Sequence, residues 1–123
     1  MPGELILTTE RLVLREFNAE DAPFVFELVN SPDYIKFIVD RNVRSVKDAA
    51  DFIEKDFIHS YSTNGFGSFH ISLKETNVPI GSSGIKKREY LDYPDIGYVL
   101  LPGYYGLGYA FEIAQSVVQY SII

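Results

Sequence analysis

Residues 95–110 read Asp95-Ile96-Gly97-Tyr98-Val99-Leu100-Leu101-Pro102-Gly103-Tyr104-Tyr105-Gly106-Leu107-Gly108-Tyr109-Ala110, and they decide the fold because three structural signals follow one another there. The apolar run from Ile96 to Leu101 predicts a strand, a glycine-rich turn follows it, and apolar residues then recur at helical spacing as far as Ser121. A helix that starts at such a turn has free N–H donors and roughly half a positive charge, so it favours an anion such as phosphate. The glycines are equally expected in an ordinary turn, where they only relieve backbone strain.

The length and composition predict one soluble globular domain. The 123 residues suffice for a single hydrophobic core, and no apolar run approaches the roughly 18 residues that would cross a bilayer, so we expect no membrane partner. The absence of cysteine excludes disulfides, thiolate nucleophiles and cysteine metal sites, and it fits a reducing compartment. The first residues lack a basic segment before an apolar one, which argues against a secretory signal, and we expect a cytoplasmic protein.

The charge balance narrows the class of partner. A net charge of −6 argues against nucleic-acid binding, because phosphate backbones are held mainly by lysine and arginine. An acidic protein is better suited to a cationic substrate. The run Lys86-Lys87-Arg88 is either the solvated end of a strand or a point of attraction for a phosphorylated ligand.

The residues before the opening stretch predict an alternation of strands and helices, and hence an α+β fold. Alternating polar and apolar residues indicate strands, whereas capping residues followed by apolar residues three or four apart indicate helices. We expect strands over 11–17, 68–74 and 79–87, and helices from Asn18 to about Asn30, over 33–37, and from Ser45 to Asn64.

Two further patterns predict packing. The long helix after Ser45 has an apolar stripe, which is formed by Val46, Ala49, Ala50, Ile53, Phe57 and Tyr61. Gly81 and Gly84 leave the strand over 79–87 without a side chain at two positions, which indicates a bulge or a close approach between backbones. Ser82 and Ser83 on that strand are expected to face solvent, and contact with a substrate backbone is the alternative.

The order of these elements and three of their segments resemble the GNAT superfamily of acetyltransferases. The nearest branch acetylates protein N-termini and includes the ribosomal-protein alanine N-acetyltransferases. Residues 7–15 (Leu-Thr-Thr-Glu-Arg-Leu-Val-Leu-Arg) look like the first strand of that branch. Residues 95–100 look like its signature strand, and residues 105–112 (Tyr-Gly-Leu-Gly-Tyr-Ala-Phe-Glu) look like its acetyl-CoA loop.

The resemblance implies a mixed, mostly antiparallel sheet flanked by helices, formed by one domain over residues 1–123. The family fold normally continues with further strands and another helix, so the resemblance implies a domain that is incomplete at its C-terminus. Gly103 is a second departure, because the family loop often begins with arginine or glutamine. An exposed sheet edge would make a homo-oligomer or strand exchange plausible.

The resemblance also assigns the site for acetyl-CoA, the expected co-substrate. The backbone of Val99, Leu100 and Leu101 would pair with the pantetheine arm like a neighbouring strand. The pyrophosphate would bind main-chain donors of the loop, which are supplied by Tyr105, Gly106, Leu107, Gly108, Tyr109 and Ala110. Glu112 also lies near the start of this helix, but its carboxylate would repel phosphate, so we interpret it as structural or outward-facing.

Acetyl transfer to an amine requires a group that accepts the ammonium proton. Asp95 begins the signature strand, where some family members place a general base that works through water, although a strand-start aspartate is more often a surface residue. Glu89 and Asp92 would attract a cationic amine, and Tyr98 would either line the substrate groove or pack. The resemblance implies an N-acetyltransferase that acts on a protein or peptide N-terminus, with polyamines or aminoglycosides as alternative acceptors.

The alternative function, from a different class, is a non-catalytic domain that keeps the fold and acts by binding or assembly. Metal and serine-triad chemistry are not expected, because the two histidines, His59 and His70, stand in no cluster. Neither histidine receives a functional role from the sequence.

Overall fold

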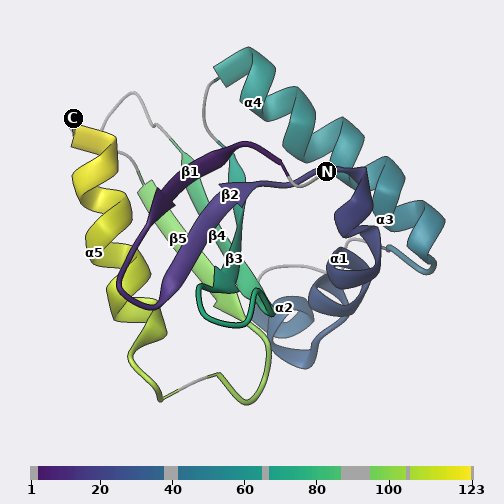
Figure 1. Cartoon of the computed structure of the whole chain (residues 1–123). Helices are drawn as coiled ribbons and strands as arrows, with labels where there is room; N and C mark the ends of the chain where they lie inside the picture. Colours follow the sequence, from purple (N-terminus) through teal and green to yellow (C-terminus); the bar gives the residue numbers. More distant parts are fainter. Residues whose placement is uncertain (1–2, 38–41, 65–66, 87–94, 105, 123) are drawn as a thin grey trace.

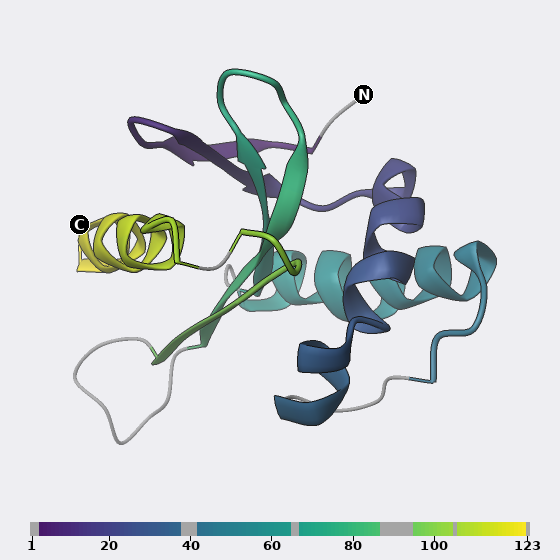
Figure 2. The same ribbon diagram turned by 90° about the horizontal axis from the view of Figure 1, so that it is seen from below.

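The protein forms a five-stranded sheet with helices on both faces in the computed structural model, which describes residues 3–37, 42–64, 67–86, 95–104 and 106–122. The strand order is β1-β2-β3-β4-β5, and all four pairings are antiparallel. Helix α5 covers one face, and α1 to α4 lie on the other (Figures 1 and 2). The helices and strands are β1 (Leu5–Thr8), β2 (Leu12–Glu16), η1 (Ala19–Asp21), α1 (Ala22–Val29), α2 (Pro32–Phe37), α3 (Val46–Phe52), η2 (Ile53–Ile58), α4 (His59–Asn64), β3 (Ser68–Leu73), β4 (Pro79–Lys86), β5 (Asp95–Leu100) and α5 (Tyr109–Ile122).

The first strands form a hairpin rather than the single strand that the alternation predicts. Leu5 opposes Arg15 and Thr8 opposes Val13, and the Thr9 N–H donates to the Leu12 carbonyl across the turn (2.8 Å). The apolar residues before Thr8 therefore belong to a separate edge strand, β1. The alternation of polar and apolar residues predicts β2 because one face of that strand is buried. Strand β1 is shorter and partly exposed, so its pattern is weaker.

Asn18 starts the first helical segment, as its residue type predicts. Its side-chain oxygen accepts from the Glu20 N–H (3.0 Å), and the Asp21 carboxylate accepts from the Asn18 N–H (2.9 Å). This reciprocal cap opens the 3₁₀ turn η1, which leads into α1. Helix α1 ends at Val29 and the short helix α2 follows from Pro32, so both predicted helices are confirmed.

The long helix after Ser45 is continuous but contains a π-helical segment, η2. Its buried residues Ala49, Ile53 and Phe57 are spaced by four, and four residues exceed one 3.6-residue α-helical turn. A wider π-helical turn therefore keeps such a series on one face. Val46 is an exception to the predicted stripe: it is 45% exposed, because it lies in the first turn, beyond the edge of the core.

Strands β3, β4 and β5 are neighbours in the half of the sheet that carries the candidate functional site. The register shifts between Ile71 and Ser72, so β4 carries a bulge there. A Cβ at Gly81 would lie 2.1 Å from the Val99 carbonyl oxygen, whereas one at Gly84 would find only the Ser68 hydroxyl at 3.9 Å. The predicted bulge and close approach are both confirmed, and Gly81 is the residue that requires glycine.

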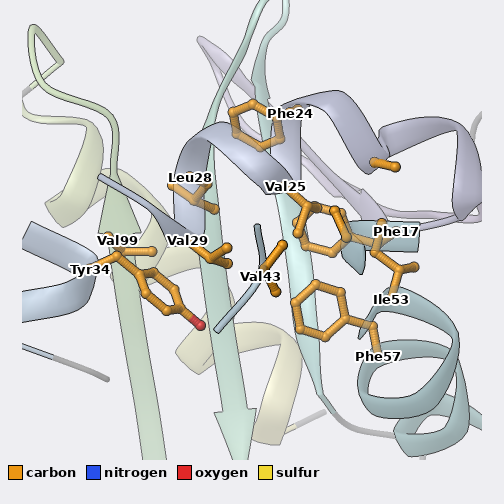
Figure 3. Packing of buried hydrophobic residues seen from close by; sticks show 12 residues of the cluster. Phe17, Phe24, Val25, Leu28, Val29, Tyr34, Val43, Ile53, Phe57 and Val99 are labelled. Carbon is orange, nitrogen blue, oxygen red and sulfur yellow. The ribbon is translucent and has the colours of Figure 1, made fainter. Parts of the chain in front are cut away.

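Two hydrophobic cores hold the layers together. Under α5 the buried residues are Leu12, Leu14, Phe69, Ile71, Ile80, Leu100 and Ile113. On the other face, side chains of α1, α3 and η2 meet those of the sheet, and Figure 3 shows this cluster, with Phe17 beside Phe57 and Val99 beside Tyr34. The neighbours Val99 and Leu100 thus point to opposite faces, as alternation along a strand requires.

The central strands bury polar residues, contrary to the sequence-based expectation for two of them. Ser82 and Ser83 are 8% and 0% exposed, because helices cover both faces of β4, so the prediction that they face solvent is wrong. His70 on β3 is also buried. No helix among the described residues is long and apolar enough to span a membrane.

Candidate functional site

The glycine loop connects β5 to α5 at one end of the sheet. Gly103, Gly106 and Gly108 have φ angles of 99°, 77° and 82°, in the left-handed region that favours glycine. A Cβ at Gly103 or Gly106 would meet nothing within 4 Å, so the backbone path, and not crowding, demands glycine at these two positions. The loop therefore presents bare backbone at its surface.

The first N–H donors of α5 have no partner within the helix itself. The Gly108 carbonyl accepts from the Glu112 N–H (3.1 Å), which makes Gly108 the residue that precedes the first helical turn. The N–H groups of Tyr109, Ala110 and Phe111 come before any donor that can bond within the helix. Because glycine has no side chain to cap them, these three amides can serve an anion.

Glu112 is structural, as the sequence indicated. Its carboxylate accepts from the Thr9 hydroxyl, the Arg11 N–H (3.0 Å) and the Arg11 Nε (2.7 Å). Burial alone would raise the pKa of Glu112, but these hydrogen bonds and the guanidinium charge hold its pKa below the ordinary value. The carboxylate is therefore ionised and turned toward the β1–β2 turn.

Arg11 joins that turn to the loop itself. Its Nη1 donates to the Leu107 carbonyl (2.9 Å), and its guanidinium carbon lies 4.4 Å from the centre of the Tyr109 ring. Figure 1 shows the β1–β2 turn beside the start of α5. Arg11 and Thr9 were missed as site residues. A signal existed, because Glu112 needs a cationic partner and no lysine or arginine follows Arg88.

Strand β5 forms one edge of the described sheet, and its main-chain groups alternate in direction. The Leu101 N–H donates to the Ile80 carbonyl (2.8 Å), so this N–H and, by alternation, the main-chain groups of Val99 face β4. By the same alternation, the groups of Tyr98 and Leu100 face the outer edge, with which no described strand pairs. Of the three residues expected to pair with the pantetheine arm, Leu100 is the one that points outward.

The remaining predicted site residues are only partly located. Tyr98 is 51% exposed, on the same face of the sheet as Leu100. Asp95 pairs with Lys86 at the start of β5, and the position of its side chain lies outside the description. Glu89, Asp92 and Tyr105 lie outside the described residues.

A polar cluster lies on the face of the sheet that α1 to α4 cover. Arg15 binds Asp21 through two hydrogen bonds (2.8 and 2.9 Å), and Asp21 Oδ1 lies 4.0 Å from Nε2 of His70. His70 is packed between the rings of Phe17 and Phe24, and its Nδ1 has no partner. Burial first, and the Arg15 charge second, lower the pKa of His70 to about 4. Within the described residues no group of His, Asp and Glu side chains has the arrangement of a metal site.

Comparison with known families and proteins gives one consistent result. The family described as "Acetyltransferase (GNAT) domain" matches residues 11–122. The uncharacterized N-acetyltransferase YnaD of Bacillus subtilis is 30% identical over 114 residues, which are 93% of this chain and 64% of YnaD. The chain spans 64–65% of the length of the curated relatives it matches.

Solved structures have the same fold. A GNAT-family acetyltransferase from Bacillus anthracis superposes with a TM-score of 0.74 at 29% identity, over 94% of this chain and 64% of that protein. RimL, a ribosomal L7/L12 alpha-N-protein acetyltransferase solved with coenzyme A, superposes with a TM-score of 0.75. The latter pair shares 19% identity over 94% of this chain and 66% of RimL, so it supports the fold alone.

Proposed function

This chain belongs to the GNAT acetyltransferase family, and from that membership we propose that it binds acetyl-CoA and transfers the acetyl group to a primary amine. The acceptor in this proposal is the N-terminus of a protein or peptide. The loop from Leu101 to Gly108 and the start of α5 carry the proposal, because this is the one described segment that combines bare backbone with available helix N–H groups. A diphosphate is the part of coenzyme A that fits such donors.

The outer edge of β5 supports the placement of the pantetheine arm. Its amide groups are spaced like those of a strand, and the main-chain groups of Tyr98 face that edge. An extended chain that contains amide groups can form the same main-chain hydrogen bonds at this edge as a neighbouring strand would. The arm would run past Leu100 toward the loop, where the diphosphate binds.

The proposed reaction is direct attack of a neutral amine on the thioester carbonyl. A C–N bond forms, the C–S bond breaks, and coenzyme A leaves as a thiolate that must be protonated. Asp95 accepts the ammonium proton, directly or through water, and Glu89 and Tyr98 contact the acceptor. The net charge of −6 favours a cationic acceptor, and polyamines or aminoglycosides are the alternative substrates.

The first test measures thermal stability with and without acetyl-CoA. A specific ligand at about one hundred times its Kd adds about 2.7 kcal/mol to the free energy of unfolding. Gly106→Val should abolish the shift, because a β-branched residue disfavours the φ of 77° found there. Gly84→Ala is the matched control and should keep the shift. No shift in the wild-type chain at millimolar acetyl-CoA would refute the proposal.

The second candidate is a domain of this fold that binds or assembles without catalysis. The outer edge of β5, with which no described strand pairs, favours it, because such an edge can pair with a second copy of the chain. Thiol release with peptide and polyamine acceptors distinguishes the two functions. Acetyl-CoA binding without thiol release, together with a dimer in light scattering, would favour the second candidate.

A further inference from the structure

The ion pair between Arg11 and Glu112 connects two elements that lie at opposite ends of the sequence, directly beneath the glycine loop. We propose that Arg11 is a positioning residue for the diphosphate: it fixes the direction of loop amides and keeps the charge of Glu112 away from the ligand. The inference rests on the proposed function and deepens it. Arg11 acts through the loop backbone, and it need not touch the ligand.

Two peptide groups at the start of α5 are held in fixed directions. In a planar trans peptide, the carbonyl of one residue and the N–H of the next point in opposite directions. Nη1 of Arg11 holds the Leu107 carbonyl, so the Gly108 N–H points away from Arg11. The Gly108 carbonyl is held by the Glu112 N–H, so the Tyr109 N–H points away from the body of the helix. Two successive donors are thus fixed before any ligand arrives.

The charge of Glu112 also acts on an anion at the start of α5. Glu112 lies in the first turns of α5, where a carboxylate competes with a bound anion for the positive end of the helix. Its three donors, one from Thr9 and two from Arg11, turn it toward the β1–β2 turn. Arg11 also cancels its charge at 2.7 Å. Without that guanidinium, the carboxylate would face an approaching diphosphate uncompensated.

The shape of the Arg11 guanidinium matters as well as its charge. One planar group bonds the Glu112 carboxylate and the Leu107 carbonyl at once, and it lies over the Tyr109 ring. A Cβ at Gly108 would lie 3.2 Å from Nη2 of Arg11, so glycine at this position also leaves room for the guanidinium of Arg11. A lysine ammonium supplies the charge but not this geometry. Arg11→Lys should therefore keep the positive charge beside Glu112 but only part of the orientation of the loop amides.

The test compares the diphosphate affinity of five forms of the chain: wild type, R11Q, R11K, E112Q and the control K74Q. Lys74 is a suitable control, because its Nζ lies 3.4 Å from the Thr9 carbonyl at the same turn. The probes are inorganic pyrophosphate, acetyl-CoA and pantetheine, which lacks phosphate. Amide NMR shifts of residues 106–110 report where pyrophosphate binds, and calorimetry gives each Kd.

We expect R11Q to weaken pyrophosphate and acetyl-CoA binding about tenfold, the effect of one charge-assisted hydrogen bond, and to leave pantetheine binding unchanged. R11K should fall between R11Q and wild type, and K74Q should bind like wild type. E112Q should bind pyrophosphate at least as tightly as wild type, because glutamine still accepts from Arg11 and carries no charge. If the ion pair only stabilised the fold, E112Q would weaken pyrophosphate binding as much as R11Q does.

Equal pyrophosphate affinity in folded R11Q and wild type would overturn the inference, and so would pyrophosphate shifts that miss the loop amides. If R11Q fails to fold, the comparison of R11K with E112Q replaces it: equal losses overturn the inference, and opposite changes support it. Failure of the proposed function has a different signature. In that case wild type ignores acetyl-CoA, while pyrophosphate binding at residues 106–110 still depends on Arg11.

Discussion

His70 predicts that the protein loses stability in mild acid, as the pH falls below the ordinary histidine pKa of 6.5. The histidine side chain is 3% exposed and packs between Phe17 and Phe24, at 5.4 and 5.2 Å between ring centres. The positively charged form would be costly there, because burial and the nearby Arg15 both disfavour it and Asp21 only partly offsets them. The native state therefore keeps His70 neutral.

The sign and size of the effect follow from linkage. His70 has a pKa of about 4 in the folded chain and an ordinary value of 6.5 when unfolded. Between those values the unfolded state binds a proton that the native state does not, so stability falls as the pH falls from 6.5 to 4 and then levels off. The loss from this one residue is about 2 kcal/mol between pH 7.5 and pH 5, and about 3 kcal/mol by pH 4. Asp21, whose pKa is lowered from 3.8, contributes its loss only in more acidic solution.

Urea denaturation at several pH values between 7.5 and 4.5, followed by circular dichroism, measures this loss. In His70→Leu the loss between pH 7.5 and 5 should shrink by about 2 kcal/mol relative to wild type. His59→Gln removes the other, exposed histidine and should keep the wild-type dependence. If His70→Leu and wild type lose equal stability over this range, the reasoning about the buried imidazole is refuted.

Three further predictions concern packing and capping. Ile113→Ala empties a fully buried position between α5 and the sheet, and urea titration should show a loss of about 2–5 kcal/mol; a negligible loss would mean that α5 is loosely attached. Gly81→Ala should cost about 1–3 kcal/mol, because its Cβ would overlap the Val99 carbonyl, whereas Gly84→Ala has room; equal melting temperatures would contradict this. Ser45→Ala removes the acceptor for the Asp48 N–H (3.0 Å) and should cost about 1 kcal/mol, with Ser45→Asp as the variant that retains it; an unchanged melting temperature in Ser45→Ala would refute the cap.

Much of the fold was predictable because its signals are local. Asn18 and Ser45 each start a helix through a hydrogen bond to an amide two or three residues away, so their residue types suffice. The alternation in β3 is equally local, since Phe69 and Ile71 fill one core. The bulge at Gly81 was also signalled, because a glycine inside a strand already indicates a close backbone approach.

The features that the sequence does not predict depend on contacts between residues far apart in the chain. Ser82 and Ser83 are buried because two helical layers cover β4, which no local pattern records. The direction of the main-chain groups at Val99 and Leu101 depends on the register with β4, and a single-residue change of register would reverse it. Arg11 was missed as a site residue because its partner Glu112 is 101 residues away.

That separation also has a consequence for the order in which the chain folds. Contacts between residues 101 apart close almost the whole chain into a loop, so they carry a high entropic cost and form after local hairpins and helices. During synthesis, the β1–β2 hairpin emerges early and must wait for α5 before Leu12 and Leu14 are covered. The nascent protein therefore passes through a stage with an exposed apolar sheet face, where chaperones would bind and where aggregation competes with folding.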